Sequence, residues 1–288
     1  MGETQRERVS LLIHLSYERL CFLSQITGPT GGILTMDVHI GTSGYSYKDW
    51  KGVFYPPTLP DRKMLSYYCQ FFDTLELNVT YYRIPTLRTM TGIAETTPDD
   101  FHVWVKAHQD MTHHRGKNPD IFPQFLGCIR PLQDQGKFQG VLLQFPFSFK
   151  GNRENCLYLK ELRERLGELN LAVEFRHDSW ITAEVLDFLR GLNMTYCIPD
   201  EPDLPGLVPP DPHVTSRIAY VRFHGRNKQH WWRGGDRYNY EYSEEELTEW
   251  LPRIDRLSKT AQIVFLLFNN CHLGQAVRNA LWMKEALC

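Results

Sequence analysis

Eight short apolar runs recur along this chain, and segments of helical periodicity separate nearly all of them. The runs lie at 38–44, 74–78, 102–106, 140–146, 171–177, 195–200, 218–225 and 262–270. The helical segments lie at 63–72, 86–96, 122–132, 155–166, 182–192, 244–257 and 276–287. Near-continuous apolar strands that alternate with helices are typical of a parallel sheet covered on both faces.

Eight such units in about 250 residues match the size of one closed (β/α) barrel. The alternative is an open doubly wound sheet, which usually carries a GxGxxG turn after a strand, and no such turn follows these runs. The sequence therefore predicts the α/β class and a single-domain TIM-type barrel of parallel strands.

Residues 1–35 look like an addition to this barrel. The stretch at 9–28 is moderately apolar, but His14, Glu18 and Arg19 interrupt it, whereas a secretory signal has a continuous apolar run. Three glycines and a proline then break the chain. We expect an N-terminal extension over 1–35 and one barrel domain over 36–288.

The composition excludes several classes of protein. Of the 288 residues, 42% are hydrophobic and 23% are charged, as in ordinary globular proteins. A net charge of −2 argues against a surface that binds nucleic acid or anionic membrane as a whole, although it permits a local basic pocket. No apolar run reaches the roughly 18 residues that span a bilayer. The seven cysteines are scattered without a CxxC, so we expect free thiols and a cytoplasmic location.

Polar side chains gather at the C-terminal ends of the predicted strands, where barrel enzymes place their functional groups. Alternate residues of a strand face the same side, so Glu174 and Arg176 should both face the barrel axis while Phe175 faces the helices. Glu76 with Asn78, and Arg222 with His224, form similar pairs around Leu77 and Phe223. The other polar strand-end residues are Lys106, Gln144, His177, Arg226, Asn269, Asn270 and His272.

A charge buried at a barrel mouth costs several kcal/mol unless it is paired. These residues could therefore form a salt-bridge plug or a ligand site, and polar groups at six strand ends favour the ligand site. The excess of cations suits phosphate or carboxylate, whose geometry matches the guanidinium fork. The loop at 226–240 adds interleaved basic and aromatic residues, which suit a nucleotide or single strand, or simply pack on the rim.

Three of these residues are candidate catalytic groups. A glutamate beside arginine or lysine has a lowered pKa and serves as a base, which applies to Glu76 and Glu174. His224 can donate or accept a proton near neutral pH. Metal-ligand residue types are present, but neighbouring lysine and arginine would repel a cation, so a divalent metal is not favoured and the cofactor is unknown.

Six ordered motifs resemble the YecE-like family, which is also called domain of unknown function 72. They are GTSGYSYKDWKGVFYP at 41–56, ELNVTYYRIP at 76–85, LQFPFSF at 143–149, EFRHDSW at 174–180, RFHGR at 222–226 and NNCHLGQAVRNA at 269–280. The resemblance covers about residues 38–287 and implies a TIM-type barrel without an established activity. Its motifs add Tyr81 and Trp180 to the ligand-binding candidates, and a fold likeness to endonuclease IV-type barrels implies DNA or phosphoester binding.

We expect an enzyme, phosphoester hydrolase-like, that binds or processes a phosphate-bearing ligand such as a nucleic acid or sugar phosphate. Arg176, Arg222 and Lys106 would hold the anion. One alternative is a proton-transfer isomerase or lyase acting on a sugar or carboxylated substrate. Another is a noncatalytic binding protein whose mouth is blocked by internal Glu–Arg pairs. We expect no membrane partner, and the sequence does not specify an oligomeric state.

Overall fold

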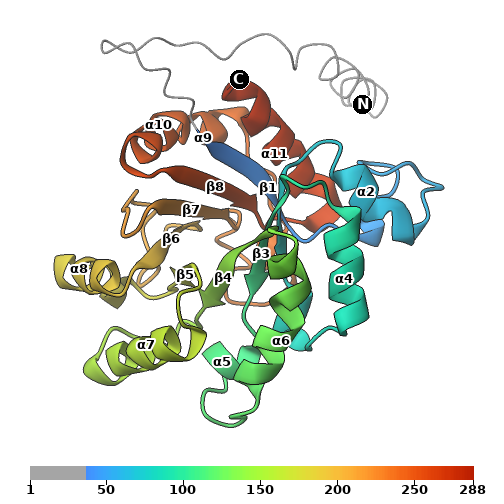
Figure 1. Cartoon of the computed structure of the whole chain (residues 1–288). Helices are drawn as coiled ribbons and strands as arrows, with labels where there is room; N and C mark the ends of the chain where they lie inside the picture. Colours follow the sequence, from blue (N-terminus) through green and yellow to red (C-terminus); the bar gives the residue numbers. More distant parts are fainter. Residues whose placement is uncertain (1–36) are drawn as a thin grey trace, which may run out of the picture.

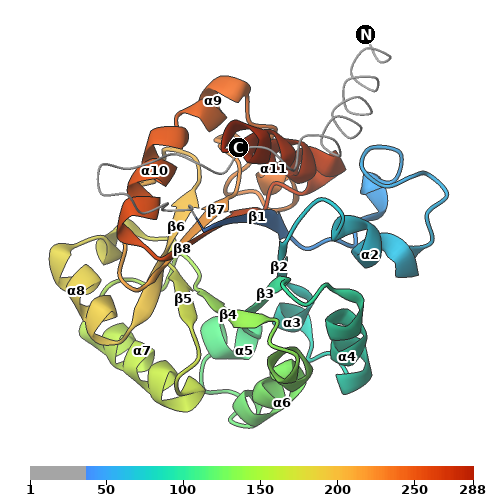
Figure 2. The same ribbon diagram turned by 45° about the horizontal axis from the view of Figure 1, so that its top comes forward.

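A computed structural model describes residues 37–288, where eight parallel strands close into a barrel through the pairing of β1 with β8 (Figures 1 and 2). The strands are β1 (Val38–Ser43), β2 (Thr74–Leu77), β3 (His102–Lys106), β4 (Phe138–Gln144), β5 (Leu171–Glu174), β6 (Met194–Asp200), β7 (Ile218–Phe223) and β8 (Ile263–Phe268). The predicted TIM-type barrel is confirmed. The extension expected at 1–35 lies outside the described residues.

Helices surround the barrel, as Figure 2 shows. They are α2 (Met64–Tyr68), α3 (Val79–Tyr82), α4 (Leu87–Thr96), α5 (Gln109–Thr112), α6 (Ile121–Asp134), α7 (Arg153–Leu166), α8 (Ala183–Gly191), α9 (Glu244–Thr248), α10 (Leu251–Thr260) and α11 (Gln275–Ala286). Short 3-10 turns are η1 (Lys48–Trp50), η2 (Asp61–Lys63), η3 (Asp178–Trp180), η4 (Gly235–Tyr238) and η5 (His272–Gly274). Side chains of Thr86, Asn152 and Thr182 accept from backbone N–H groups at the starts of α4, α7 and α8, which fixes where those helices begin.

The helix predicted over 244–257 is wrong in one respect, because it is two helices, α9 and α10. Pro252 stands in the first turn of α10. Proline has no N–H, and within a continuous helix its ring would clash with the carbonyl four residues earlier, here that of Thr248. A proline is tolerated in a first turn, so the chain ends one helix at Thr248 and begins another at Leu251.

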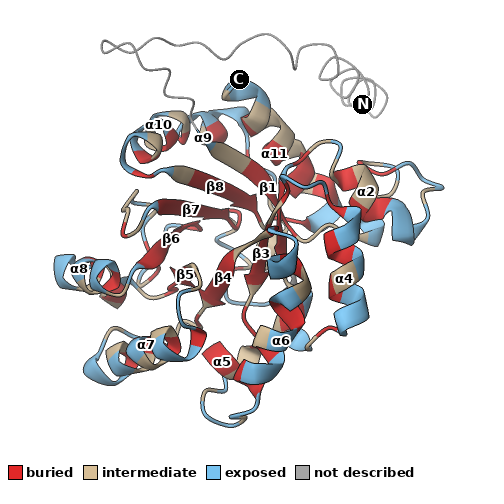
Figure 3. Cartoon of the chain, viewed as in Figure 1, coloured by how far each residue is buried: buried red, intermediate tan, exposed pale blue. Residues whose placement is uncertain are grey.

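Two apolar cores meet at the strands. On β7, Tyr220 belongs to the cluster inside the barrel, whereas Val221 and Phe223 belong to the larger cluster between strands and helices. Figure 3 shows the consequence, with buried strands at the centre and exposed residues on the outer sides of the helices. Leu77 and Phe175 also lie in the outer core, so the predicted alternation at these strand ends is confirmed.

Aromatic rings fill the middle of the barrel and form the base on which the polar end rests. The Trp104 ring lies edge-on to Tyr220 and Phe265, with centroids 4.6 and 5.4 Å away. A Cβ atom on Gly140 would lie 2.5 Å from the Trp104 ring and from the carbonyl oxygen of Asn170. Glycine is therefore the residue that permits this ring to occupy the barrel interior.

No helix between residue 37 and the C-terminus is both long and apolar enough to cross a membrane. The six cysteines in the same part of the chain are free thiols.

A histidine near the N-terminal end of the barrel links two aspartates. His39 Nδ1 lies 2.9 Å from Asp73 Oδ2, and His39 Nε2 lies 3.0 Å from Asp37 Oδ1. Burial alone would lower the pKa of His39, but these two carboxylates raise it above its ordinary value. The folded state therefore binds this proton more tightly than the unfolded state, so the stabilisation is fully present below about pH 6.5 and is lost as the pH rises through the raised pKa.

We expect H39Q to lower the free energy of unfolding more at about pH 5.5 than at about pH 9, because only protonated His39 pairs with both carboxylates. Urea unfolding of wild type and variant at the two pH values measures the difference. An equal loss at both would mean that the ring contributes packing alone.

Candidate functional site

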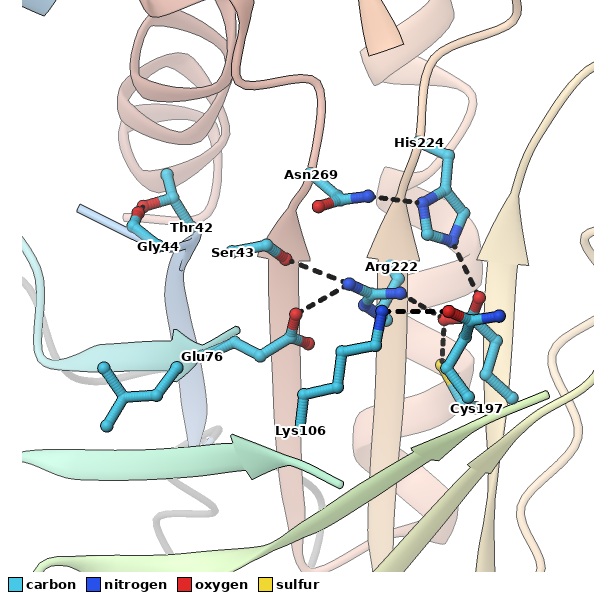
Figure 4. A network of polar contacts seen from close by, with 12 residues as sticks. Thr42, Ser43, Gly44, Glu76, Lys106, Cys197, Arg222, His224 and Asn269 are labelled. Atoms are coloured by element: carbon cyan, nitrogen blue, oxygen red, sulfur yellow. Dashed lines mark hydrogen bonds and ion pairs between the residues drawn. The ribbon is translucent and has the colours of Figure 1, made fainter. Parts of the chain in front are cut away.

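A buried network of charged side chains closes the C-terminal end of the barrel interior (Figure 4). Arg222 on β7 is 1% exposed, and its guanidinium donates to Glu76 on β2 at 2.6 Å and to Glu174 on β5 at 2.5 Å. The hydroxyl of Tyr220 donates to the other oxygen of Glu76 at 2.7 Å. Both carboxylates are fully buried. Since each has a cationic partner, the interior tolerates their charge.

Arg176 forms a second level of this network. Its guanidinium lies 2.6 Å from Glu174 and 3.0 Å from Glu201, which follows β6. Burial alone would raise the pKa of Glu174, but Arg176 and Arg222 hold it well below its ordinary value. Burial outweighs Arg176 at Glu201 and raises the pKa of that carboxyl to about 7. Arg176 and Arg222 therefore pair with Glu76, Glu174 and the partly protonated Glu201, so the positive and negative charges of the network nearly cancel.

His224 lies within the same network. Its Nε2 is 3.3 Å from Glu174 Oε1, and its Nδ1 is 3.0 Å from the side-chain amide of Asn269. Burial and the positive charge of Arg176 lower the pKa of His224 to about 3. The ring is consequently neutral at physiological pH, with both nitrogens engaged by neighbouring side chains.

A cavity of about 340 Å³ lies at the barrel mouth, and the buried charged network forms its floor. Among the described residues that line it, none carries a carboxylate, and its cationic or imidazole side chains are Lys106, His113, Arg176 and Arg237. The remaining lining residues are Tyr81, Tyr82, Gln144, Pro146, Phe147, Leu207, Trp231, Trp232 and Tyr238. The cavity thus joins positive charge with aromatic faces.

Lys106 at the end of β3 lines this cavity. Its amine donates to Gln144 Oε1 at 2.9 Å and lies 4.4 Å from the centroid of the Tyr81 ring. Within residues 37–288 the amine forms no ion pair. Burial, followed by the charge of Arg222, lowers the pKa of Lys106 to about 7.

The loop at 226–240 combines both interpretations that the sequence left open. Trp231 is buried, with the guanidinium of Arg237 5.0 Å from its ring, and its carbonyl accepts from Arg237 Nε at 2.7 Å. Trp232 is 53% exposed and lies edge-on to Phe147 at 4.9 Å. One tryptophan therefore packs inside the rim, and the other leaves a ring surface open to solvent beside the cavity.

The structure brings nine of the fifteen predicted site residues together. Tyr81, Lys106, Gln144 and Arg176 line the cavity, and Glu76, Glu174, Arg222, His224 and Asn269 belong to the network beneath it. The candidate bases Glu76 and Glu174 do not line the cavity, and each holds an arginine in place. Their catalytic roles stay predictions, as does that of His224.

The other six lie apart from the cavity lining. Trp180 stacks on Phe175 in the outer core, with ring centroids 4.2 Å apart. Arg226 pairs with Asp200 at 2.8 Å, and Asn270 donates to Asn279 at 2.8 Å. The His177 ring lies 4.8 Å from that of Phe147, while Asn78 is half-buried and His272 is exposed. Of these, His177 contacts a lining residue. Sequence position at a strand end therefore overstates how many side chains reach the cavity.

Sequence reasoning missed several participants. Four more residues line the cavity from segments that follow β2, β3, β4 and β6, and they are Tyr82, His113, Phe147 and Leu207 in that order. Glu201 pairs with Arg176 in the network below. Three of these residues had a signal, since Glu201 directly follows the last residue of β6, and Tyr82 and Phe147 lie within the motifs at 76–85 and 143–149. The others belong to segments after the strands, where spacing does not tell which side chain turns inward.

Across residues 37–288, no group of three or more histidine, cysteine, aspartate or glutamate side chains is arranged to hold a metal ion.

Comparisons with known proteins agree with this architecture. A family model described as "Protein of unknown function DUF72" matches residues 39–288. The UPF0759 protein YunF of Bacillus subtilis is 34% identical over 269 residues, which cover 87% of this chain and 94% of that protein. A DUF72 family protein of Thermotoga maritima is 43% identical with a TM-score of 0.81, covering 87% of this chain and 98% of that one. One from Enterococcus faecalis is 26% identical with a TM-score of 0.78, covering 87% and 95%.

Proposed function

The chain belongs to the DUF72 family of proteins of unknown function, and from the charge of its barrel mouth we propose that it is an enzyme that binds a small phosphate-bearing molecule there. The observation that carries the proposal is a cavity lined by Lys106, Arg176 and Arg237 with no carboxylate among its described lining residues.

Arg237 supports the proposal most directly. Within the described chain its guanidinium has no carboxylate partner, and its Nε donates to a backbone carbonyl. Arg176 lines the same cavity but is largely neutralised by Glu174 and Glu201. An uncompensated guanidinium in a recess is a site for a phosphate, because its fork matches two phosphate oxygens.

The size and lining of the cavity favour a small molecule over a polymer. A volume of about 340 Å³ lies at the lower end of the range of small-molecule sites. Aromatic faces such as those of Tyr81 and Trp232 can stack on a sugar or another flat group while the cations hold its phosphate. A sugar phosphate therefore fits better than a nucleic acid strand.

Calorimetric titration with inorganic pyrophosphate tests the proposal. We expect R237Q to weaken binding about tenfold or more, since a hydrogen bond to a charged group contributes roughly 1.5–3 kcal/mol. The matched control is R233Q, because Arg233 belongs to the same loop, is exposed and does not line the cavity. Equal affinities of R237Q and R233Q would contradict an anion site in the cavity, and binding of oligonucleotides alone would favour nucleic acid instead.

A second candidate function is proton transfer by an isomerase or lyase on a sugar or carboxylated substrate. It is favoured by Lys106, because an amine whose pKa is about 7 can exist unprotonated at neutral pH. The free thiols support a reducing, cytoplasmic location for either activity.

A further inference from the structure

Lys106 differs from the other cations around the cavity in its surroundings. Arg176 has two carboxylate partners, and Arg237 bonds to a backbone carbonyl, whereas the amine of Lys106 has one neutral acceptor, Gln144. It projects from β3 toward Arg222, as Figure 4 shows. Among the described residues no carboxylate forms an ion pair with this amine, and its position close to Arg222 makes the ammonium form unfavourable.

The charged groups around Lys106 explain its protonation. Burial lowers its pKa most, followed by repulsion from Arg222, while Glu174 and Glu76 oppose the shift and Arg176 adds to it. The two carboxylates are already hydrogen-bonded to arginine, so their attraction for the lysine is offset. With a pKa of about 7, roughly half of the amine is neutral at neutral pH, compared with well under 1% for an ordinary lysine.

Two contacts hold the amine in one place. Gln144 Nε2 donates to the carbonyl of Phe145 at 2.7 Å, which directs Gln144 Oε1 toward Lys106. The face of the Tyr81 ring lies on the amine at 4.4 Å from the ring centroid. A neutral amine donates one proton to Gln144 and keeps its lone pair for an electrophile in the cavity.

From this geometry we propose that Lys106 forms an imine with the carbonyl carbon of a small aldehyde or ketone that bears a phosphate or carboxylate. The proposal rests on the proposed function, because the cavity must hold the anionic end of the molecule. Arg237 and Arg176 would bind that end while the carbonyl carbon meets the amine.

The step balances without another reactant. The amine lone pair forms a C–N bond while the C=O π electrons move to oxygen, which takes up one amine proton to give a carbinolamine. The C–O bond then breaks, the second amine proton leaves with the oxygen as water, and an imine remains. Protonation of that imine withdraws electrons from the adjacent carbon, which suits the isomerase or lyase alternative.

Reductive trapping of the full chain tests the proposal. The protein is incubated with glyoxylate and cyanoborohydride, and the modified lysines are located by peptide mass mapping. At about pH 7 we expect Lys106 to react at least tenfold faster than exposed Lys228, because about half of the Lys106 amine is neutral and Gln144 and Tyr81 hold it in the cavity. The rate at Lys106 should level off above about pH 7.

The comparison within wild type does not depend on the folding of a variant. K106M supplies a second test, because methionine keeps much of the side-chain volume but has no amine, so trapping at this position should be lost. A Lys106 rate no greater than that of Lys228 would overturn the proposal, even if pyrophosphate bound and the proposed function stood. Fast trapping that pyrophosphate does not slow, in a protein that does not bind pyrophosphate, would support the imine while contradicting the anion site.

Discussion

Replacing Arg222 with methionine is expected to lower the free energy of unfolding by about 3–5 kcal/mol, the cost of removing one partner from a buried ion pair. The reason is that R222M leaves Glu76 and Glu174 buried without the guanidinium that bridges them at 2.6 and 2.5 Å. Arg176 remains beside Glu174, so Glu76 loses more. Urea unfolding at neutral pH measures the change.

A matched control separates burial from ion pairing as such. Arg190 pairs with Asp187 at 2.5 Å on the surface, and we expect R190M to cost less than about 1 kcal/mol. Adding E76Q to R222M should recover part of the loss, because an amide needs no counter-charge. Similar costs for R222M and R190M would show that the floor of the cavity gains little from its charges.

The cost of R222M should also depend on pH. In wild type, Arg176 and Arg222 stabilise the ionised form of Glu174 despite its burial, so its pKa is lower in the folded than in the unfolded state. Its contribution to the free energy of unfolding is therefore present above the unfolded pKa of about 4.3 and is lost as the pH falls through the folded pKa. Without Arg222, the effect of burial on Glu174 meets less opposition, and this carboxylate takes up a proton more readily. The difference between variant and wild type should therefore be largest near neutral pH and smaller in acid.

The strand alternation explains why so much of the fold could be predicted from the sequence. A period of two assigns each strand residue to the inside or the outside of the barrel, and Phe175 and Phe223 both lie where that rule puts them. The same rule correctly put Glu174 and Arg176 on one side, where they pair at 2.6 Å. At these strand ends the tertiary packing agrees with the strand period.

The rule does not give the depth of a side chain along the barrel axis. Arg222 and Arg176 both face inward, yet Arg222 is enclosed by two glutamates while Arg176 also reaches the cavity. From the sequence alone, a salt-bridge plug and a ligand site are alternative arrangements of these residues. In the structure, the ion pairs form a floor and the cavity lies over it, because successive inward positions occupy successive levels.

No comparable rule predicts the direction of a side chain in a loop. Trp231 is buried and Trp232 is exposed although they are adjacent, and the strand and helix periods do not apply to their loop. Arg226 was expected in the pocket, but its guanidinium pairs with the buried carboxylate of Asp200. The direction of a loop side chain depends on partners that are distant in sequence.

Asp200 at the end of β6 supplies the second large expected effect. Its carboxylate accepts from the Arg226 guanidinium at 2.8 and 3.0 Å, from the Tyr242 hydroxyl at 2.7 Å and from the Trp250 indole at 2.7 Å. It thereby connects β6 to the segment after β7 and to the helices that follow. We expect D200A to lower the free energy of unfolding by about 3–5 kcal/mol, because three donors lose a shared buried acceptor.

Two comparisons make this expectation specific. Y242F removes one of these hydrogen bonds and also leaves the buried Gly225 N–H without its acceptor, so it should cost about 1–3 kcal/mol. D187A removes an exposed aspartate and should cost less than about 1 kcal/mol. Because Arg226 begins the loop that carries Arg237 to the cavity, D200A should also weaken pyrophosphate binding in protein that remains folded. A D200A variant as stable as D187A, or one that is destabilised but binds pyrophosphate like wild type, would show that Asp200 does not couple the fold to the cavity.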